Sequence, residues 1–90
     1  MIALENILKI AANYRNIPVQ EIQNKSRKRK YIDIKKAFVI YAAENTRNDY
    51  NEIAKLIGND RTMVYYYLNQ PIHIEIKEIV MYLKSILNEK

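Results

Sequence analysis

The sequence predicts an all-α domain, a small bundle of about six helices, on three observations. One glycine and two prolines among 90 residues are too few for the turns of a β-rich fold. Hydrophobic residues make up 49% of the chain, which is ordinary for a globular protein and argues against wholesale disorder. Apolar residues recur at the three, four and seven spacing of an amphipathic helix. Because the chain is too short for a second core, we expect one domain over residues 1–90.

The first half of the chain contains three predicted helices. Apolar spacing near the start predicts a helix over 3–14. Asn16 tolerates a left-handed backbone and Pro18 suits a first helical turn, so a short helix is expected over 18–23. The next segment, "NKSRKRK", has no apolar period and is predicted to be a loop. The period then resumes and predicts a helix over 31–45.

The second half predicts two short helices joined by a tight turn. The first spans 49–57, can be capped by Asn48 or Asp49, and ends at Gly58, the single glycine of the chain. The second spans 60–69. A pair of helices with this connection has the form of a helix-turn-helix, although a plain helical hairpin in a small bundle has the same spacing.

The ends of the second short helix and the start of the last helix also have sequence signals. Asp60 is expected to supply a side-chain oxygen that caps the helix 60–69. Pro71 stops that helix. Apolar residues then predict a long C-terminal helix over 73–88, as an addition to the helix-turn-helix domain.

Three consecutive tyrosines lie on the helix 60–69, and they cannot all face one core. At about 100° per residue, Tyr67 falls on the inward face with Val64. Tyr65 and Tyr66 point outward, beside Arg61, and form a plausible binding face. The alternative is that one of the two outward tyrosines packs against the basic loop or the last helix.

The positive charge of the chain is concentrated in one short segment. The net charge is +5, and residues 24–36 contain seven basic side chains against Asp33 alone, an excess of six. A concentrated basic patch of this kind indicates a polyanionic partner, most often nucleic acid. The alternative is a solvated charge run that serves only solubility.

Several functional classes find little support in the sequence. The single histidine, His73, is interpreted as a surface residue at a helix start, and the carboxylates show no pairing or metal-ligand spacing. With no cysteine, disulfides and thiolate zinc sites are excluded. We therefore expect no catalytic residue, metal, cofactor or small-molecule substrate. No apolar run approaches the length of a membrane span, so no membrane partner is expected.

Three blocks of sequence, in order, resemble the C-terminal DNA-binding domain of the bacterial replication initiator DnaA, a Trp-repressor-like helix-turn-helix. The first block is "YRNIPVQEI" followed by "NKSRKRK", where the family has a helix leading to a basic loop. The second is "IDIKKAFVIYAAENT", similar to the family's long helix of the type "VRARQIAMYLARELT". The third is "YNEIAKLIGNDRTMV", close to the pattern "LPEIGRAFGGRDHTTV". The resemblance covers roughly Leu8 to Asn69.

The resemblance implies which residues contact DNA. The arginine that enters the minor groove in the family matches Arg27 or Arg29. The family residues Asp-His-Thr-Thr, which read bases in the major groove, fall on residues 60–63. Together with the basic patch and the outward tyrosines, the expected contact set is Lys25, Arg27, Lys28, Arg29, Lys30, Lys35, Asp60, Arg61, Thr62, Met63, Tyr65 and Tyr66.

The sequence also departs from the family pattern. Its turn is one residue shorter, with "GND" in place of "GGRD", so the family's arginine before the aspartate is missing. Arg61 replaces the histidine and Met63 the second threonine, so the family's usual DNA box need not be the target. Asp33 stands where an arginine is common and is expected to weaken a nearby phosphate contact. The sequence contains no P-loop, so the resemblance implies a DNA-binding module and not an initiator.

The leading expectation is sequence-specific binding of double-stranded DNA through the recognition helix 60–69 and the basic loop 25–30, in replication control or transcriptional regulation. The alternative is a protein-interaction or anti-initiator module, of a phage or plasmid type, that kept the fold and binds a host protein. A third hypothesis is single-stranded nucleic acid stacking on Tyr65 and Tyr66. The helix 73–88 either forms a homodimer contact or simply covers the first helix. The expected location is the cytoplasm, at the bacterial nucleoid or as a phage or plasmid product.

Overall fold

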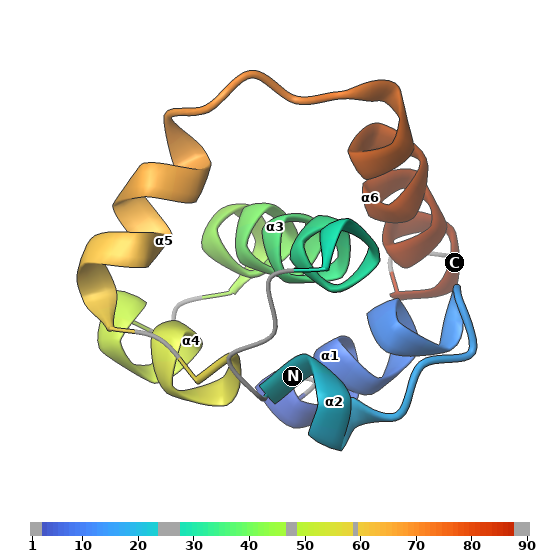
Figure 1. Cartoon of the computed structure of the whole chain (residues 1–90), viewed down its shortest axis with the longest axis horizontal. Coiled ribbons are helices and arrows are strands. Elements are labelled where there is room, and N and C mark those ends of the chain that lie inside the picture. The colour runs from blue at the N-terminus through green and yellow to red at the C-terminus, as the bar shows by residue number, and fades with distance from the viewer. Residues whose placement is uncertain (1–2, 24–27, 47–48, 59, 88–90) are drawn as a thin grey trace.

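Five helices surround one central helix, α3, as Figure 1 shows. The structure is a computed structural model, and it describes residues 3–23, 28–46, 49–58 and 60–87. The helices of this part are α1 (Leu4–Asn13), α2 (Val19–Gln23), α3 (Arg29–Asn45), α4 (Tyr50–Leu56), α5 (Arg61–Leu68) and α6 (Ile74–Leu87). The predicted all-α fold of about six helices is confirmed. Within the described ranges, no helix has both the length and the hydrophobicity to cross a bilayer.

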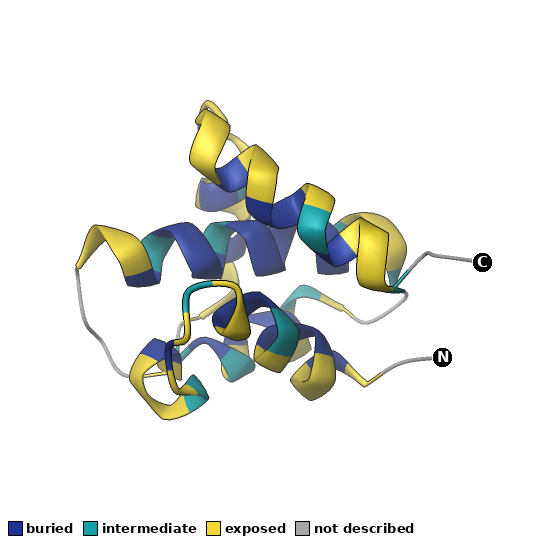
Figure 2. Cartoon of the chain, turned by 90° about the vertical axis from the view of Figure 1, so that its right-hand side faces the viewer, coloured by how far each residue is buried: buried dark blue, intermediate teal, exposed yellow. Residues whose placement is uncertain are grey.

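The helix α3 is central, and the middle of its length is apolar on every side. Six consecutive residues, 37–42, are buried, and an amphipathic stripe with one polar face cannot produce such a run. Helix α3 packs against each of the other five helices. In Figure 2 the buried residues form a continuous band on the helix faces that are turned to the centre, while the outer faces are exposed.

The last helix, α6, is part of the core. Its buried residues Ile76, Ile79 and Leu83 face the bundle, and α6 packs on both α3 and α1. The expectation that this helix covers the first helix is therefore met, with α3 as a further contact. Ile86, which fits the same apolar period, is exposed near the end of the helix. The homodimer through residues 73–88 stays a prediction.

The connection between α1 and α2 follows the sequence signals. Asn16 has a φ of 56°, the left-handed conformation expected for it. The backbone N–H of Ile17 donates to the carbonyl of Ala12 at 3.0 Å and closes the turn. Pro18 precedes α2, and its carbonyl accepts from the N–H groups of the first helical turn.

The start of α3 differs from the expected position. The helix begins at Arg29, so Arg29 and Lys30 are helical and do not belong to a loop. Lys28 has an extended backbone, and its carbonyl accepts from the N–H of Tyr31 at 3.0 Å and of Ile32 at 3.1 Å. Arginine and lysine are good helix formers, so this first turn forms without an apolar residue to mark it. Residues 24–27, which include Lys25 and Arg27, lie outside the described part of the chain.

The two short helices begin in different ways. Asp49 caps α4 through a capping box, in which its carboxylate accepts from the N–H of Glu52 at 2.9 Å. Asp60 occupies the corresponding position before α5 with an extended backbone, but its side chain makes no capping hydrogen bond. The expectation of a side-chain cap there is wrong. The first turn of α5 is instead closed by the backbone bond from the N–H of Met63 to the carbonyl of Asp60, at 3.1 Å.

Candidate nucleic-acid interface

The helices α4 and α5 pack against each other across a tight turn that requires glycine. Gly58 has a φ of +72°, a conformation that L side chains rarely adopt. A Cβ added at this position would lie 2.4 Å from the backbone carbonyl oxygen of Gln23. The turn of the helix-turn-helix therefore touches the C-terminal end of α2, at the point where the chain enters the basic segment.

The burial of α5 sorts its tyrosines as expected. Tyr67 is 6% exposed and lies in the core with Val64, whereas Tyr65 is 48% and Tyr66 55% exposed. Arg61, Thr62 and Asp60 are also exposed, at the start of the helix. Met63, at the border of the two faces, is half-buried and packs against the core. The exposed face of α5 thus combines a guanidinium, a hydroxyl and two aromatic rings.

Contacts restrict how freely the α5 side chains move. The ring of Tyr65 meets the ring of Tyr50 from α4 edge-on, with centroids 5.1 Å apart. This contact lies with α4 and not with the basic loop or the last helix. Asn69 donates its side-chain N–H to the carbonyl of Tyr65 at 2.9 Å, so it binds the C-terminal end of its own helix. The side-chain amide of Asn69 is therefore already engaged within α5.

Three predicted DNA-contacting residues gather at the N-terminus of α3. Lys28, Arg29 and Lys30 are exposed, and the side chain of Lys28 makes no capping bond to the helix. Helix N-termini carry partial positive charge, so basic residues there are electrostatically unfavourable in the free protein. An anion bound at this end would relieve that repulsion and would also meet free backbone N–H groups.

Lys35, which was expected to contact DNA, is buried, whereas Lys36, which was not in the expected contact set, is directed towards α5. Lys35 is only 3% exposed, and burial lowers the pKa of its ammonium from the usual 10.5. This burial does not support its expected contact with DNA, because Lys35 lies on the same face of α3 as Tyr31, Phe38 and Val39, which are all buried. The helical period of these neighbours was a signal for its burial.

Lys36 is the basic residue that the expected contact set left out. Its Nζ lies 5.8 Å from the ring centroid of Tyr67, so it is directed towards α5. Positions 29 and 36 are seven residues apart and lie on one face of α3. The face of α3 that carries Arg29 and Lys36 is therefore turned towards the recognition helix.

Asp33 is buried and does not face a solvent-side phosphate. Its Oδ2 lies 3.3 Å from an Nη of Arg15, with which it forms an ion pair. The local charge of Asp33 is thus balanced within the protein. Its expected weakening of a phosphate contact is not supported by this placement.

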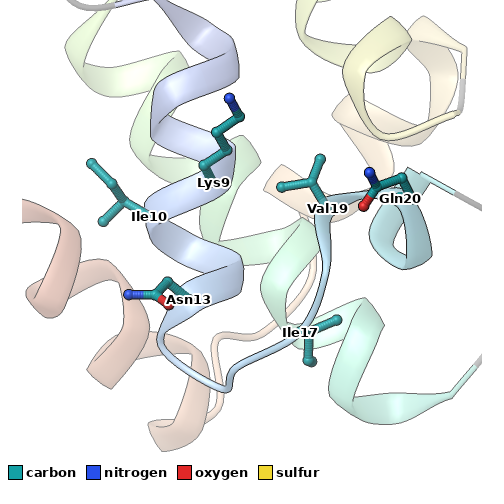
Figure 3. Close-up of a pocket in the computed structure, with 6 residues that line it drawn as sticks. All are labelled: Lys9, Ile10, Asn13, Ile17, Val19 and Gln20. Carbon is teal, nitrogen blue, oxygen red and sulfur yellow. The ribbon is translucent and has the colours of Figure 1, made fainter.

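A groove lies beside the first two helices. It has a volume of about 480 Å³ and is lined by Lys9, Ile10, Asn13, Ile17, Val19 and Gln20. Figure 3 shows that these side chains come from α1, from the connection that follows it and from the first residues of α2. The floor of the groove is mainly apolar, and Lys9 is its one charged group. Among the described residues, no group of three metal-ligating side chains is close enough to hold an ion.

A family model of the bacterial DnaA protein helix-turn-helix matches residues 4–70 of the chain. The chain belongs to this family. Comparisons with curated proteins and with solved structures gave no match. The matched range contains α1 to α5 of this DnaA-type domain and ends before α6. A DnaA-type helix-turn-helix is a DNA-binding domain and not an enzymatic fold, so membership of the family implies that the partner is DNA.

Proposed function

We propose that this DnaA-type domain binds double-stranded DNA in a sequence-specific manner, with α5 in the major groove. The observation that carries the proposal is the exposed face of α5, where Arg61 and Thr62 lie in the first turn of the helix and Tyr65 and Tyr66 in the second. The N-terminal residues of a recognition helix are those that reach base edges first. In this arrangement Arg61 donates to the O6 and N7 of a guanine, and Thr62 offers a methyl group to a thymine.

The basic residues at the start of α3 have a different role in the proposal. Lys28, Arg29 and Lys30 bind the phosphate backbone or enter the minor groove, and Lys36 contributes from the next turns of the same helix. Lysine and arginine contacts with phosphate fix the position of the protein but carry no sequence information. The close approach of Gly58 to the backbone of Gln23 brings the C-terminal end of α2 beside the turn before α5. A single surface of the protein can therefore contact both a DNA groove and the phosphate backbone beside it.

The experiment that tests the proposal is a selection from random duplex DNA, followed by affinity measurements on the selected site. Arg61→Ala should weaken binding to that site by about 1–3 kcal/mol and relax the preference at one base position. Lys28→Ala is the matched control, because losing a phosphate contact weakens all sequences about equally.

The salt dependence checks the electrostatic part of the proposal. If about five phosphates are neutralised, log K should fall against log salt with a slope of about −4 to −5. Binding to duplex DNA that is undetectable or insensitive to salt contradicts the proposal. Preference for single strands over duplex in direct competition would instead favour stacking on Tyr65 and Tyr66.

We further propose that the DNA site serves replication initiation or transcription. Occupancy of selected sites near an origin or near promoters, mapped in the host cell, distinguishes the two roles.

One observation favours interaction with a protein as a second candidate. Ile74 is 69% and Met81 67% exposed on α6, and positions seven apart share one face of a helix. Apolar residues of this kind are suited to a protein contact, either with a second copy or with a host protein. Light scattering of the wild type against Met81→Lys tests the first of these contacts: a dimer that dissociates in the variant supports it.

A further inference from the structure

Two contacts connect the start of α3 to the preceding helices, on both sides of the basic segment. We call the four residues whose side chains form the side-chain contacts, Arg15, Glu21, Tyr31 and Asp33, the brace; Arg15 also donates to the backbone carbonyl of Lys30. One contact joins residue 21 to residue 31 and the other joins residue 15 to residues 30 and 33. The chain between these residues includes the whole run 24–30. The two contacts therefore tie the first turns of α3 to residues that precede the run 24–30 in the sequence.

The first contact holds a tyrosine beneath two lysines. The hydroxyl of Tyr31 donates a hydrogen bond to the carboxylate of Glu21, and the residue is buried. The ammonium groups of Lys28 and Lys30 lie 5.9 and 5.3 Å from the centroid of the Tyr31 ring. At these distances the face of an aromatic ring attracts a cation. Fixing the ring thus restricts where both ammonium groups can be.

The second contact holds the backbone of the first helical turn. An Nη of Arg15 lies 3.3 Å from the Oδ2 of Asp33 and donates at 3.3 Å to the carbonyl of Lys30. Asp33 is buried and Arg15 is partly exposed, so solvent screens this pair less than a surface pair. The direction in which α3 begins is thereby tied to the connection between α1 and α2.

We propose that Arg15, Glu21, Tyr31 and Asp33 are positioning residues, which hold Lys28 and Lys30 in the arrangement that receives the DNA backbone. The inference rests on the proposed DNA binding. Asp33 is paired with Arg15, but Glu21 and Asp33 still lower the net charge near a basic patch, and by net charge alone they would oppose a polyanion. Side chains that are already immobilised lose less entropy on binding. The placement of these residues is explained if the entropy saved at the two lysines outweighs the electrostatic repulsion.

The test relies on the fact that electrostatic repulsion and positioning of the lysines predict opposite changes in DNA affinity when a brace carboxylate is removed. Asp33→Asn removes one negative charge, so electrostatics alone tightens DNA binding, whereas loss of the brace weakens it. Glu78→Gln, on the exposed side of α6, is the matched control with the same change of charge. Tyr31→Phe changes no charge at neutral pH, keeps the ring and removes only the hydroxyl that binds Glu21. Affinity for the selected duplex is measured over a range of salt, at a temperature where circular dichroism shows each variant to be folded.

We expect Asp33→Asn and Tyr31→Phe each to weaken binding about three- to tenfold, with a shallower salt dependence than the wild type. Glu78→Gln should bind as tightly as the wild type or more tightly, with an unchanged slope. A role in stability alone would lower the melting temperature but leave both the affinity of the folded protein and the slope unchanged.

Two results separate this inference from the proposed function. If the wild type binds duplex DNA and Asp33→Asn tightens binding as Glu78→Gln does, or Tyr31→Phe binds with wild-type affinity and slope, the brace has no positioning role. If the wild type does not bind duplex DNA, the proposed function fails and the inference fails with it. Should Asp33→Asn not fold, Tyr31→Phe alone decides the matter, because it leaves the buried ion pair intact.

Discussion

Replacing Gly58 by alanine, the smallest residue with a side chain, destabilises the fold for two separate reasons. Its φ of +72° is unfavourable for a side chain by about 1–2 kcal/mol, and a Cβ would also collide with the carbonyl of Gln23 at 2.4 Å. The partner atom belongs to the backbone, so it cannot rotate away. We therefore expect Gly58→Ala to lower the free energy of unfolding by more than about 2 kcal/mol, measured by urea denaturation.

Asn51→Ala is a suitable control for this substitution, because Asn51 is exposed on α4 in the same helix-turn-helix. It should change the free energy of unfolding by less than about 0.5 kcal/mol. A Gly58→Ala variant as stable as this control would mean that the turn can relax away from α2.

At the scale of a helix, α4 depends on its capping box. The carboxylate of Asp49 accepts from the N–H of Glu52 at 2.9 Å, and the Glu52 carboxylate accepts from the N–H of Asp49 at 3.3 Å. Removing the first bond in Asp49→Ala should destabilise the protein by about 1 kcal/mol in thermal unfolding.

Asp60→Ala gives the matched comparison, because Asp60 occupies the same position before α5 without a capping bond from its side chain. It should cost clearly less stability than Asp49→Ala. Equal losses from the two substitutions would show that the electrostatics of the helix ends, and not the capping hydrogen bond, stabilise α4.

The helices that were predicted correctly are those whose signals are local. The apolar period of α1, the left-handed Asn16 and the C-terminal glycine of α4 each depend on a few neighbouring residues, and all three are confirmed. The start of α3 was placed two residues too late, because Arg29 and Lys30 extend a helix without showing an apolar period. A periodic pattern of apolar residues identifies buried positions. It does not reveal helical residues that are exposed, such as Arg29 and Lys30.

The candidate interface could be predicted only in part for a related reason. The outward direction of Tyr65 and Tyr66 follows from the geometry of one helix and is confirmed by their exposure. The ion pair of Arg15 with Asp33 joins residues 18 positions apart, and only the folded chain shows it. Lys35 looked like part of a charged surface because the run of basic residues concealed its place on the buried side of α3.

For the whole molecule, the buried tyrosines predict a loss of stability in alkaline solution. Burial raises the pKa of Tyr41 and Tyr67 above 10.0, and the hydrogen bond with Glu21 raises the pKa of Tyr31 in the same direction. The unfolded chain therefore loses these protons at a lower pH than the folded protein. The stability that they contribute is complete below pH 10.0 and decreases as the pH rises through and beyond that value.

Lys35 acts in the opposite direction within a limited range. Its pKa in the folded protein lies below 10.5, so its contribution to stability increases with pH until the unfolded chain has also lost the proton, near pH 10.5. Above pH 10.5 only the tyrosines still make the free energy of unfolding depend on pH, so stability should fall. Tyr41→Phe and Tyr67→Phe should each make this fall less steep in denaturant titrations at several pH values. An unchanged pH dependence in both variants would contradict this explanation.

The contact between Gly58 and the carbonyl of Gln23 also limits how such a domain can acquire a new target. A turn of different length would change how α5 lies relative to the C-terminal end of α2. A change of turn length would therefore alter two parts of the surface at once. Substitutions on the exposed face of α5 alter one part only. A library that aims to retarget the domain should therefore keep positions 23 and 58 fixed and vary positions 61, 62, 65 and 66.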